Sequence, residues 1–122
     1  ICRAVLESVG FQSKDLIDAM LSDAPYIETS VLRVDGGMSS SNWSMQFLAD
    51  IINASVDRPR MLETTSLGAA WLSGMYTGFY PDQIEFSKNW LKDVRFDPKI
   101  EDSIRDNLYK GWKVAVKRTL LK

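Results

Sequence analysis

The residue types and spacing best suited to chemistry lie in the run Val34-Asp35-Gly36-Gly37-Met38-Ser39. β-Branched residues precede the two glycines and helix-capping serines follow them, so a strand should end here and a helix should begin. Two glycines permit backbone angles that other residues avoid. Such a turn can place backbone amides against a flat ligand, but an ordinary strand-to-helix turn uses the same residues. The pattern alone leaves both interpretations open.

Other reactive side chains are scarce. The chain has no histidine and a single cysteine, Cys2, so it offers neither a histidine-activated thiol nor the usual zinc ligand sets. We expect Cys2 to be a small buried apolar residue. A lone cysteine forms no internal disulfide, which is typical of a reducing compartment, and we expect a cytoplasmic protein.

The composition limits the classes of partner. Lys and Arg number 15 and Asp and Glu number 16, which gives a net charge of −1. Because nucleic acids and anionic membranes favour a basic surplus, we expect neither as a partner. No apolar run reaches the roughly 18 residues of a membrane-spanning helix, and the first residues lack the pattern of a signal peptide. Hydrophobic residues make up 45% of the 122, which is enough for the core of one domain.

The elements that would position the glycines alternate between helix and strand. In chain order we expect a helix over 1–21, a strand over 30–35, a helix after 39–42, a strand over 54–57, a helix over 67–74, irregular chain over 76–96 and a helix from 97–98 onward. This alternation is typical of an α/β fold. Two strands are too few for a stable parallel sheet, so we expect the remaining strands to lie outside this chain.

Glycines and other small residues predict close approaches at two further places. Gly10 interrupts the first helix, where we expect close packing or a kink. The helix over 67–74 admits either tight helix packing or a flat ligand, and the pattern does not choose between them. Its small residues are Gly68, Ala69, Ala70, Ser73 and Gly74.

Taken together, these motifs resemble those of the FGGY carbohydrate kinases and, among them, the glycerol kinases. The run over 34–39 is similar to the adenosine motif of the superfamily of sugar kinases, heat-shock proteins and actin. Further similar runs stand in family order: RAVLES (3–8), LRVDGG (32–37), MQ (45–46), ADI (49–51), RP (58–59), ETTSLGAA (63–70) and YKGWKVAVKR (109–118). Pentulose kinases share the double glycine and the small-residue helix but are less similar over 58–65 and 109–112.

The resemblance implies a fold and an activity. Residues 1–122 would be the carboxy-terminal part of the nucleotide-binding domain, in the second half of an α/β, ribonuclease H-like (actin/hexokinase-like ATPase) domain with few strands and flanking helices. The parent would use ATP and Mg²⁺ to convert glycerol to glycerol 3-phosphate and ADP, and we expect it to be a homo-oligomer. The amino-terminal domain, the catalytic base, the metal ligands and the glycerol contacts would lie upstream, so this part alone should be inactive.

The resemblance also carries roles onto individual residues. It implies that Gly36 and Gly37 bind the nucleotide, with the backbone of Gly37 making the contact. The family has an asparagine four residues after this glycine, where the present chain has Ser41 and, one position later, Asn42. Serine is shorter than asparagine, so we expect a water-mediated contact in its place. Asp35 is implied to be structural rather than a catalytic base or a metal ligand.

Two alternatives remain open. One is a parent kinase that acts on another small polyol or a ketose. The other is a non-catalytic module that keeps the fold for protein interaction, which the serine at position 41 and exposed aromatic residues would favour. Those aromatic residues are expected among Tyr76, Phe79, Tyr80, Phe86 and Trp90. If the sheet continues outside the chain, partners should also be missing on the faces of Val31, Val34 and Val56.

Overall fold

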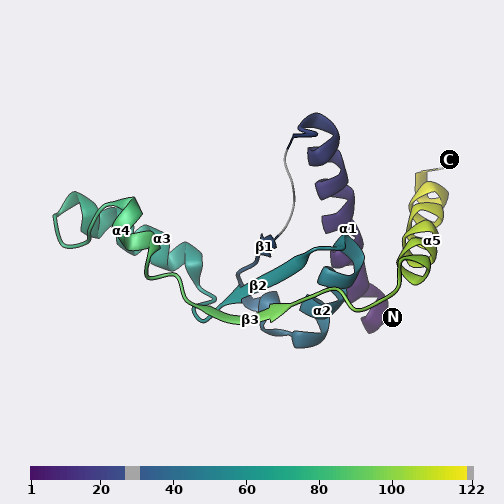
Figure 1. Cartoon of the computed structure of the whole chain (residues 1–122), viewed down its shortest axis with the longest axis horizontal. Coiled ribbons are helices and arrows are strands. Elements are labelled where there is room, and N and C mark those ends of the chain that lie inside the picture. Colours follow the sequence, from purple (N-terminus) through teal and green to yellow (C-terminus); the bar gives the residue numbers. More distant parts are fainter. Residues whose placement is uncertain (27–30, 121–122) are drawn as a thin grey trace.

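A computed structural model describes residues 1–26 and 31–120 (Figure 1). Its elements are α1 (Cys2–Asp23), β1 (Val31–Arg33), the short 3₁₀ helix η1 (Gly37–Ser40), α2 (Asn42–Ile52), β2 (Ser55–Pro59), α3 (Thr64–Tyr76), α4 (Gln83–Ser87), β3 (Lys92–Phe96) and α5 (Asp102–Leu120). Figure 1 shows a small central sheet with α1, α2 and α5 gathered around one end. From the other end α3 and α4 extend away, and we call residues 64–87 the α3–α4 arm.

β2 is the central strand of the sheet. β1 runs parallel to it, and α2 supplies the crossover that parallel neighbours require. β3 runs antiparallel to β2, with Val56 opposite Phe96 and Asp57 opposite Arg95. Beyond these pairs the register shifts, and Asp93 is the extra residue on β3. Such a bulge bends the strand and changes the direction of a side chain.

The hydrophobic core lies between α2 and the sheet. The α2 helix begins after Ser41, whose side chain caps it, and its apolar side faces β2 and β3. The buried core side chains are Met45, Leu48, Ala49, Ile52, Ala54, Val56 and Phe96. The core therefore lies directly behind the turn that carries the two glycines.

The first helix packs against α2 through a glycine. A Cβ atom at Gly10 would lie 2.9 Å from the ring of Phe47, so only glycine permits this approach. Of the two outcomes expected at Gly10, close packing or a kink, close packing is confirmed. Next to it, the ring of Phe11 meets Phe47 edge-on and stacks on Trp112 of α5, with 5.4 Å between ring centroids in each pair. Aromatic contacts thus join the three helices at this end of the sheet.

The prediction that residues 76–96 are irregular is wrong, because this segment contains α4 and β3. In β3 three of the five residues are charged, which hides the alternation of a strand. Two of these charges are satisfied by β2, since Asp93 binds Arg58 and Arg95 binds Asp57. With β3, the sheet of the described chain has three strands rather than the two that were predicted.

The last helix starts later than predicted. Asp97 and Pro98 were expected to begin it, but α5 begins at Asp102. The side chain of Asp97 instead accepts a 2.6 Å hydrogen bond from Ser55, and its carbonyl accepts a 2.8 Å bond from Gln46. These contacts tie residue 97 to the end of the sheet, so the helix starts only after a short connection.

Two burial predictions are wrong and one is confirmed. Cys2 is exposed in the first turn of α1, where no described element covers it. Val56 was expected to lack partners but is fully buried, because β3 completes the face on which it lies. Val31, on β1 at the edge of the sheet, is exposed as predicted. Among residues 1–26 and 31–120, no helix has both the length and the apolar character needed to span a membrane.

Candidate functional site

The turn after β1 brings the two glycines to the carboxyl edge of the parallel strands. Val34 continues the ladder, donating a 3.1 Å hydrogen bond to the carbonyl of Asp57. Gly36 then adopts φ +80°, a conformation that side chains disfavour, and its N–H donates to the carbonyl of Leu62 at 2.9 Å. The reversal of the chain here depends on glycine, as the sequence predicted.

The surface over the two glycines is open. A Cβ atom built on either Gly36 or Gly37 would meet no other group within 4 Å. The backbone of Gly37, the first residue of η1, is exposed to solvent. A flat group could therefore lie directly on this backbone, and a bulky side chain at Gly37 would fill the same space.

Two serines hold the glycine carbonyls from behind. The hydroxyl of Ser39 donates to the carbonyl of Gly36 at 2.6 Å, and the hydroxyl of Ser40 donates to that of Gly37 at 2.7 Å. Ser39 is buried. Sequence reasoning assigned these serines only as possible helix caps. Their spacing of three residues from the glycines is nevertheless the spacing of this side-chain-to-backbone bond, which could have indicated the role.

Ser41 has a defined structural role. Its hydroxyl oxygen accepts hydrogen bonds from the N–H of Ser44 at 3.3 Å and from the hydroxyl of Ser44 at 3.0 Å, which caps α2. Ser41 is thus the serine that caps α2. Its neighbour Asn42 accepts a 2.8 Å hydrogen bond from Arg58. A nucleotide contact by Ser41 stays a prediction.

Asp35 links the turn to the next helix. Its carboxylate accepts a hydrogen bond from the hydroxyl of Thr64, the first residue of α3. This contact agrees with the structural role expected for Asp35. Among the described residues, no three His, Cys, Asp or Glu side chains gather as a metal site.

The small residues of α3 divide between packing and exposure. A Cβ atom at Gly74 would lie 2.1 Å from the ring of Tyr80, so this glycine is required for packing within the α3–α4 arm. Ala69 and Ala70 are exposed, and the space around Gly68 is open. Tight packing therefore explains only the last of the small residues.

A largely apolar cavity of about 510 Å³ lies beside the turn, between the sheet and the α3–α4 arm. Arg33, Pro59 and Leu67 contribute to its lining, together with Trp90. The guanidinium of Arg33 lies 4.2 Å from the ring centroid of Trp90. Neither Gly36 nor Gly37 lines this cavity, so it is separate from the open surface over the glycines.

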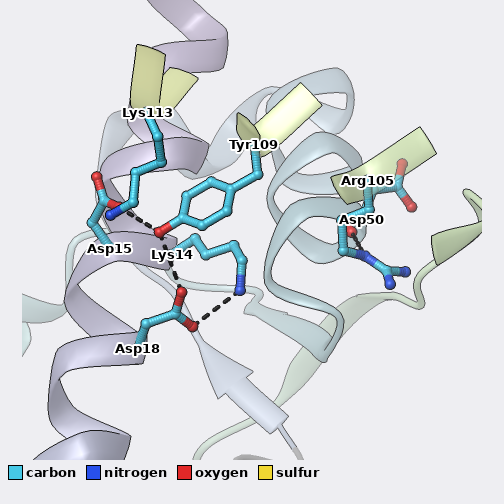
Figure 2. Close-up of polar contacts among 7 residues, drawn as sticks. All are labelled: Lys14, Asp15, Asp18, Asp50, Arg105, Tyr109 and Lys113. Atoms are coloured by element: carbon cyan, nitrogen blue, oxygen red, sulfur yellow. Dashed lines mark hydrogen bonds and ion pairs between the residues drawn. The ribbon is translucent and has the colours of Figure 1, made fainter. Parts of the chain in front are cut away.

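A polar cluster joins α1 to α5 (Figure 2). Asp15 accepts hydrogen bonds from Tyr109, from Trp112 at 2.7 Å and from Lys113 at 2.9 Å. Burial alone would raise the pKa of Asp15, but these hydrogen bonds lower it below the ordinary value. Burial and the bond to Asp15 raise the pKa of Tyr109 to about 12. These hydrogen bonds hold α5 against α1.

Comparison with known proteins places this geometry in a family. Residues 1–76 match the model of the "FGGY family of carbohydrate kinases, C-terminal domain". Glycerol kinase of Roseobacter denitrificans is 55% identical over 119 residues, and that of Sinorhizobium fredii is 53% identical over 120. These stretches cover 97% and 98% of the chain but only 24% of each relative. The chain therefore spans about a quarter of the length of these curated relatives.

Solved structures agree with this assignment. Glycerol kinase of Plasmodium falciparum, crystallised with ADP, is 36% identical with a TM-score of 0.81, covering 100% of this chain and 24% of that one. Xylulose kinase of Lactobacillus acidophilus is 19% identical with a TM-score of 0.72, covering 97% of this chain and 24% of that one. The second likeness concerns the fold alone, and together they confirm the predicted α/β fold class. The chain belongs to the FGGY family of carbohydrate kinases.

Proposed function

We propose that residues 1–122 are the carboxy-terminal part of the nucleotide-binding domain of an ATP-dependent glycerol kinase. The observation that carries the proposal is the open backbone at Gly36 and Gly37, at the carboxyl edge of β1. The identities of 55% and 53% to glycerol kinases support glycerol as the acceptor over another polyol or a ketose. The glycerol kinase of Plasmodium falciparum was crystallised with ADP, which supports a nucleotide as the ligand.

In this proposal the chain binds and orients ATP while the reaction takes place elsewhere in the parent. The adenosine lies against the backbone of Gly37, and Ser41 contacts it through water. The γ-phosphoryl group then passes to a glycerol hydroxyl, a reaction that depends mainly on positioning and on charge neutralisation. Mg²⁺ would supply the neutralisation, with ligands outside this chain, as would the proton-accepting base. A cytoplasmic location and a homo-oligomeric parent stay predictions.

The test uses the full-length protein that contains this chain. Gly37→Trp should fill the open surface and weaken ADP binding, measured by calorimetry, by at least about tenfold, or roughly 1.4 kcal/mol. Gly111→Trp is the matched control, because a Cβ atom at Gly111 on α5 also meets nothing within 4 Å. Neither backbone has a positive φ, so neither substitution strains the chain.

The outcomes separate the candidate functions. ATP-dependent phosphorylation of glycerol by the wild type, lost with Gly37→Trp but kept with Gly111→Trp, is the expected result. Equal ADP affinity in the wild type and Gly37→Trp would refute the site. A full-length protein that neither binds ADP nor phosphorylates any small polyol or ketose would instead be the non-catalytic module.

A further inference from the structure

A buried arginine lies directly behind the glycine turn. Arg58 is on β2, and its guanidinium donates five hydrogen bonds. Two of these, at 3.1 and 2.9 Å, go to one carboxylate oxygen of Asp93 on β3. The other three acceptors share the two hydrogens of Nη1; they are the carbonyls of Ser39 and Ser40 at 3.1 and 3.2 Å and the side chain of Asn42 at 2.8 Å.

The acceptors of Nη1 lie between the glycines and α2. Ser39 and Ser40 close η1, and their carbonyls are at the helix end that lacks intrahelical donors. The hydroxyls of the same two serines hold the carbonyls of Gly36 and Gly37. Ser39 and Ser40 therefore connect the guanidinium of Arg58, which binds their carbonyls, to both glycine carbonyls, which their hydroxyls bind.

The chemistry of this residue is specific to arginine. Only a planar guanidinium can bind a carboxylate on one side and three further acceptors on the other, whereas lysine offers a single ammonium group. Burying a charge in the central strand opposes folding unless its partners compensate. At the neighbouring position of β2 the charges are reversed, with Asp57 bound to Arg95 of β3, and among the described residues these two side chains make no hydrogen bond to η1.

We infer that Arg58 is a positioning residue for the nucleotide. Arg58 does not touch the nucleotide but holds in place the backbone of Gly36 and Gly37, against which the adenosine lies. The inference rests on the proposed function. Asp93 neutralises the guanidinium and fixes its orientation from the far side, so it contributes to the same effect less strongly. Without Arg58 the ends of η1 are free to move, and the glycine backbone no longer presents one surface to the adenosine.

The experiment compares three variants of the full-length protein. Arg58→Lys keeps the charge but loses the planar guanidinium and its several donors. We expect the KM for ATP and the Kd for ADP to rise about tenfold. Asp93→Asn, at a partly exposed position that should fold normally, should raise both by about threefold. Arg95→Lys is the matched control, because it weakens the other arginine–aspartate pair of the same two strands and should change both by less than about twofold.

Several readouts distinguish positioning from general stability. We expect the KM for glycerol to stay within about twofold in all three variants, because in the proposed function the glycerol contacts lie outside this chain. Melting temperature is measured in parallel. If Arg58→Lys melts earlier but keeps wild-type affinity for ADP and KM for ATP, the residue is only structural and the inference is overturned. The inference is also overturned if Arg58→Lys raises the KM for ATP and the KM for glycerol equally, or if Arg95→Lys raises the KM for ATP as much as Arg58→Lys does.

Failure of this inference is distinguishable from failure of the proposed function. A wild type that phosphorylates glycerol and binds ADP, with variants that do the same, refutes only the role of Arg58. A wild type that binds no ADP refutes both, because no nucleotide is positioned. If Arg58→Lys does not fold, Asp93→Asn decides the question: unchanged ADP affinity in that variant overturns the inference.

Discussion

The glycine turn and the α3–α4 arm follow the carboxyl ends of the parallel strands β1 and β2, but they are held in different ways. The turn is fixed by polar contacts to a buried arginine and lies directly on the core. Neither α3 nor α4 contains a buried residue. Apart from the hydrogen bond of Thr64 to Asp35, the arm is held by contacts within itself, such as the rings of Trp71 and Phe86 with centroids 5.7 Å apart. The chain therefore defines the geometry of the turn much more firmly than that of the arm.

The largest expected difference comes from truncating one apolar side chain in each region. Ile51→Ala, at a fully buried position of α2, should lower the free energy of unfolding by about 3 kcal/mol, because it leaves a cavity. Leu72→Ala, at an exposed position of α3, should lower it by no more than about 0.5 kcal/mol. Urea unfolding of the full-length protein measures both. Equal losses would show that the arm is as well packed as the core.

A second test replaces glycines rather than apolar residues. Gly10→Ala should destabilise the contact between α1 and α2 by about 2 kcal/mol, because the new methyl group overlaps the ring of Phe47. Gly111→Ala has open space in the interior of α5 and should stabilise by up to about 1 kcal/mol. Opposite signs in thermal unfolding are expected. A neutral Gly10→Ala would mean that α1 can shift away from α2.

The smallest expected effect is a dependence on pH at the helical end of the sheet. The pKa of Tyr109 is raised to about 12 in the folded chain, above the roughly 10 of an unfolded tyrosine. Its contribution to stability should therefore be complete below about pH 10 and be lost as the pH rises toward 12. Unfolding experiments across this range, with Tyr109→Phe as control, measure it. A wild type and variant with the same alkaline profile would contradict the prediction.

The sequence predicts the elements that carry strong local signals. The alternation of helix and strand, the glycine turn and the close contact at Gly10 all follow from apolar periodicity and from glycine. β3 was missed because its charges resemble those of an exposed loop until Asp57 and Arg58 of β2 are placed beside it. That pairing joins residues far apart in the chain, so no local pattern indicates it.

The candidate site was only partly predictable for the same reason. The open backbone of Gly36 and Gly37 follows from the motif itself. The function of Arg58 does not, since an arginine before a proline looks like the end of a strand. Its role depends on Asp93, which follows the arm in the sequence, and on backbone carbonyl groups. Because every residue has a carbonyl group, the sequence does not indicate which ones Arg58 binds.

The pairing of β3 with β2 also protects the fold against misalignment. If β3 slips by one residue against β2, its side chains move to the opposite face of the sheet and Phe96 leaves the core. A slip by two residues keeps the faces but replaces Arg95 opposite Asp57 with Asp93 or Asp97, depending on direction. In either direction, the two-residue slip places two carboxylates opposite each other across the strands, which is unfavourable. The order of charges along β3 thus favours the observed alignment with β2.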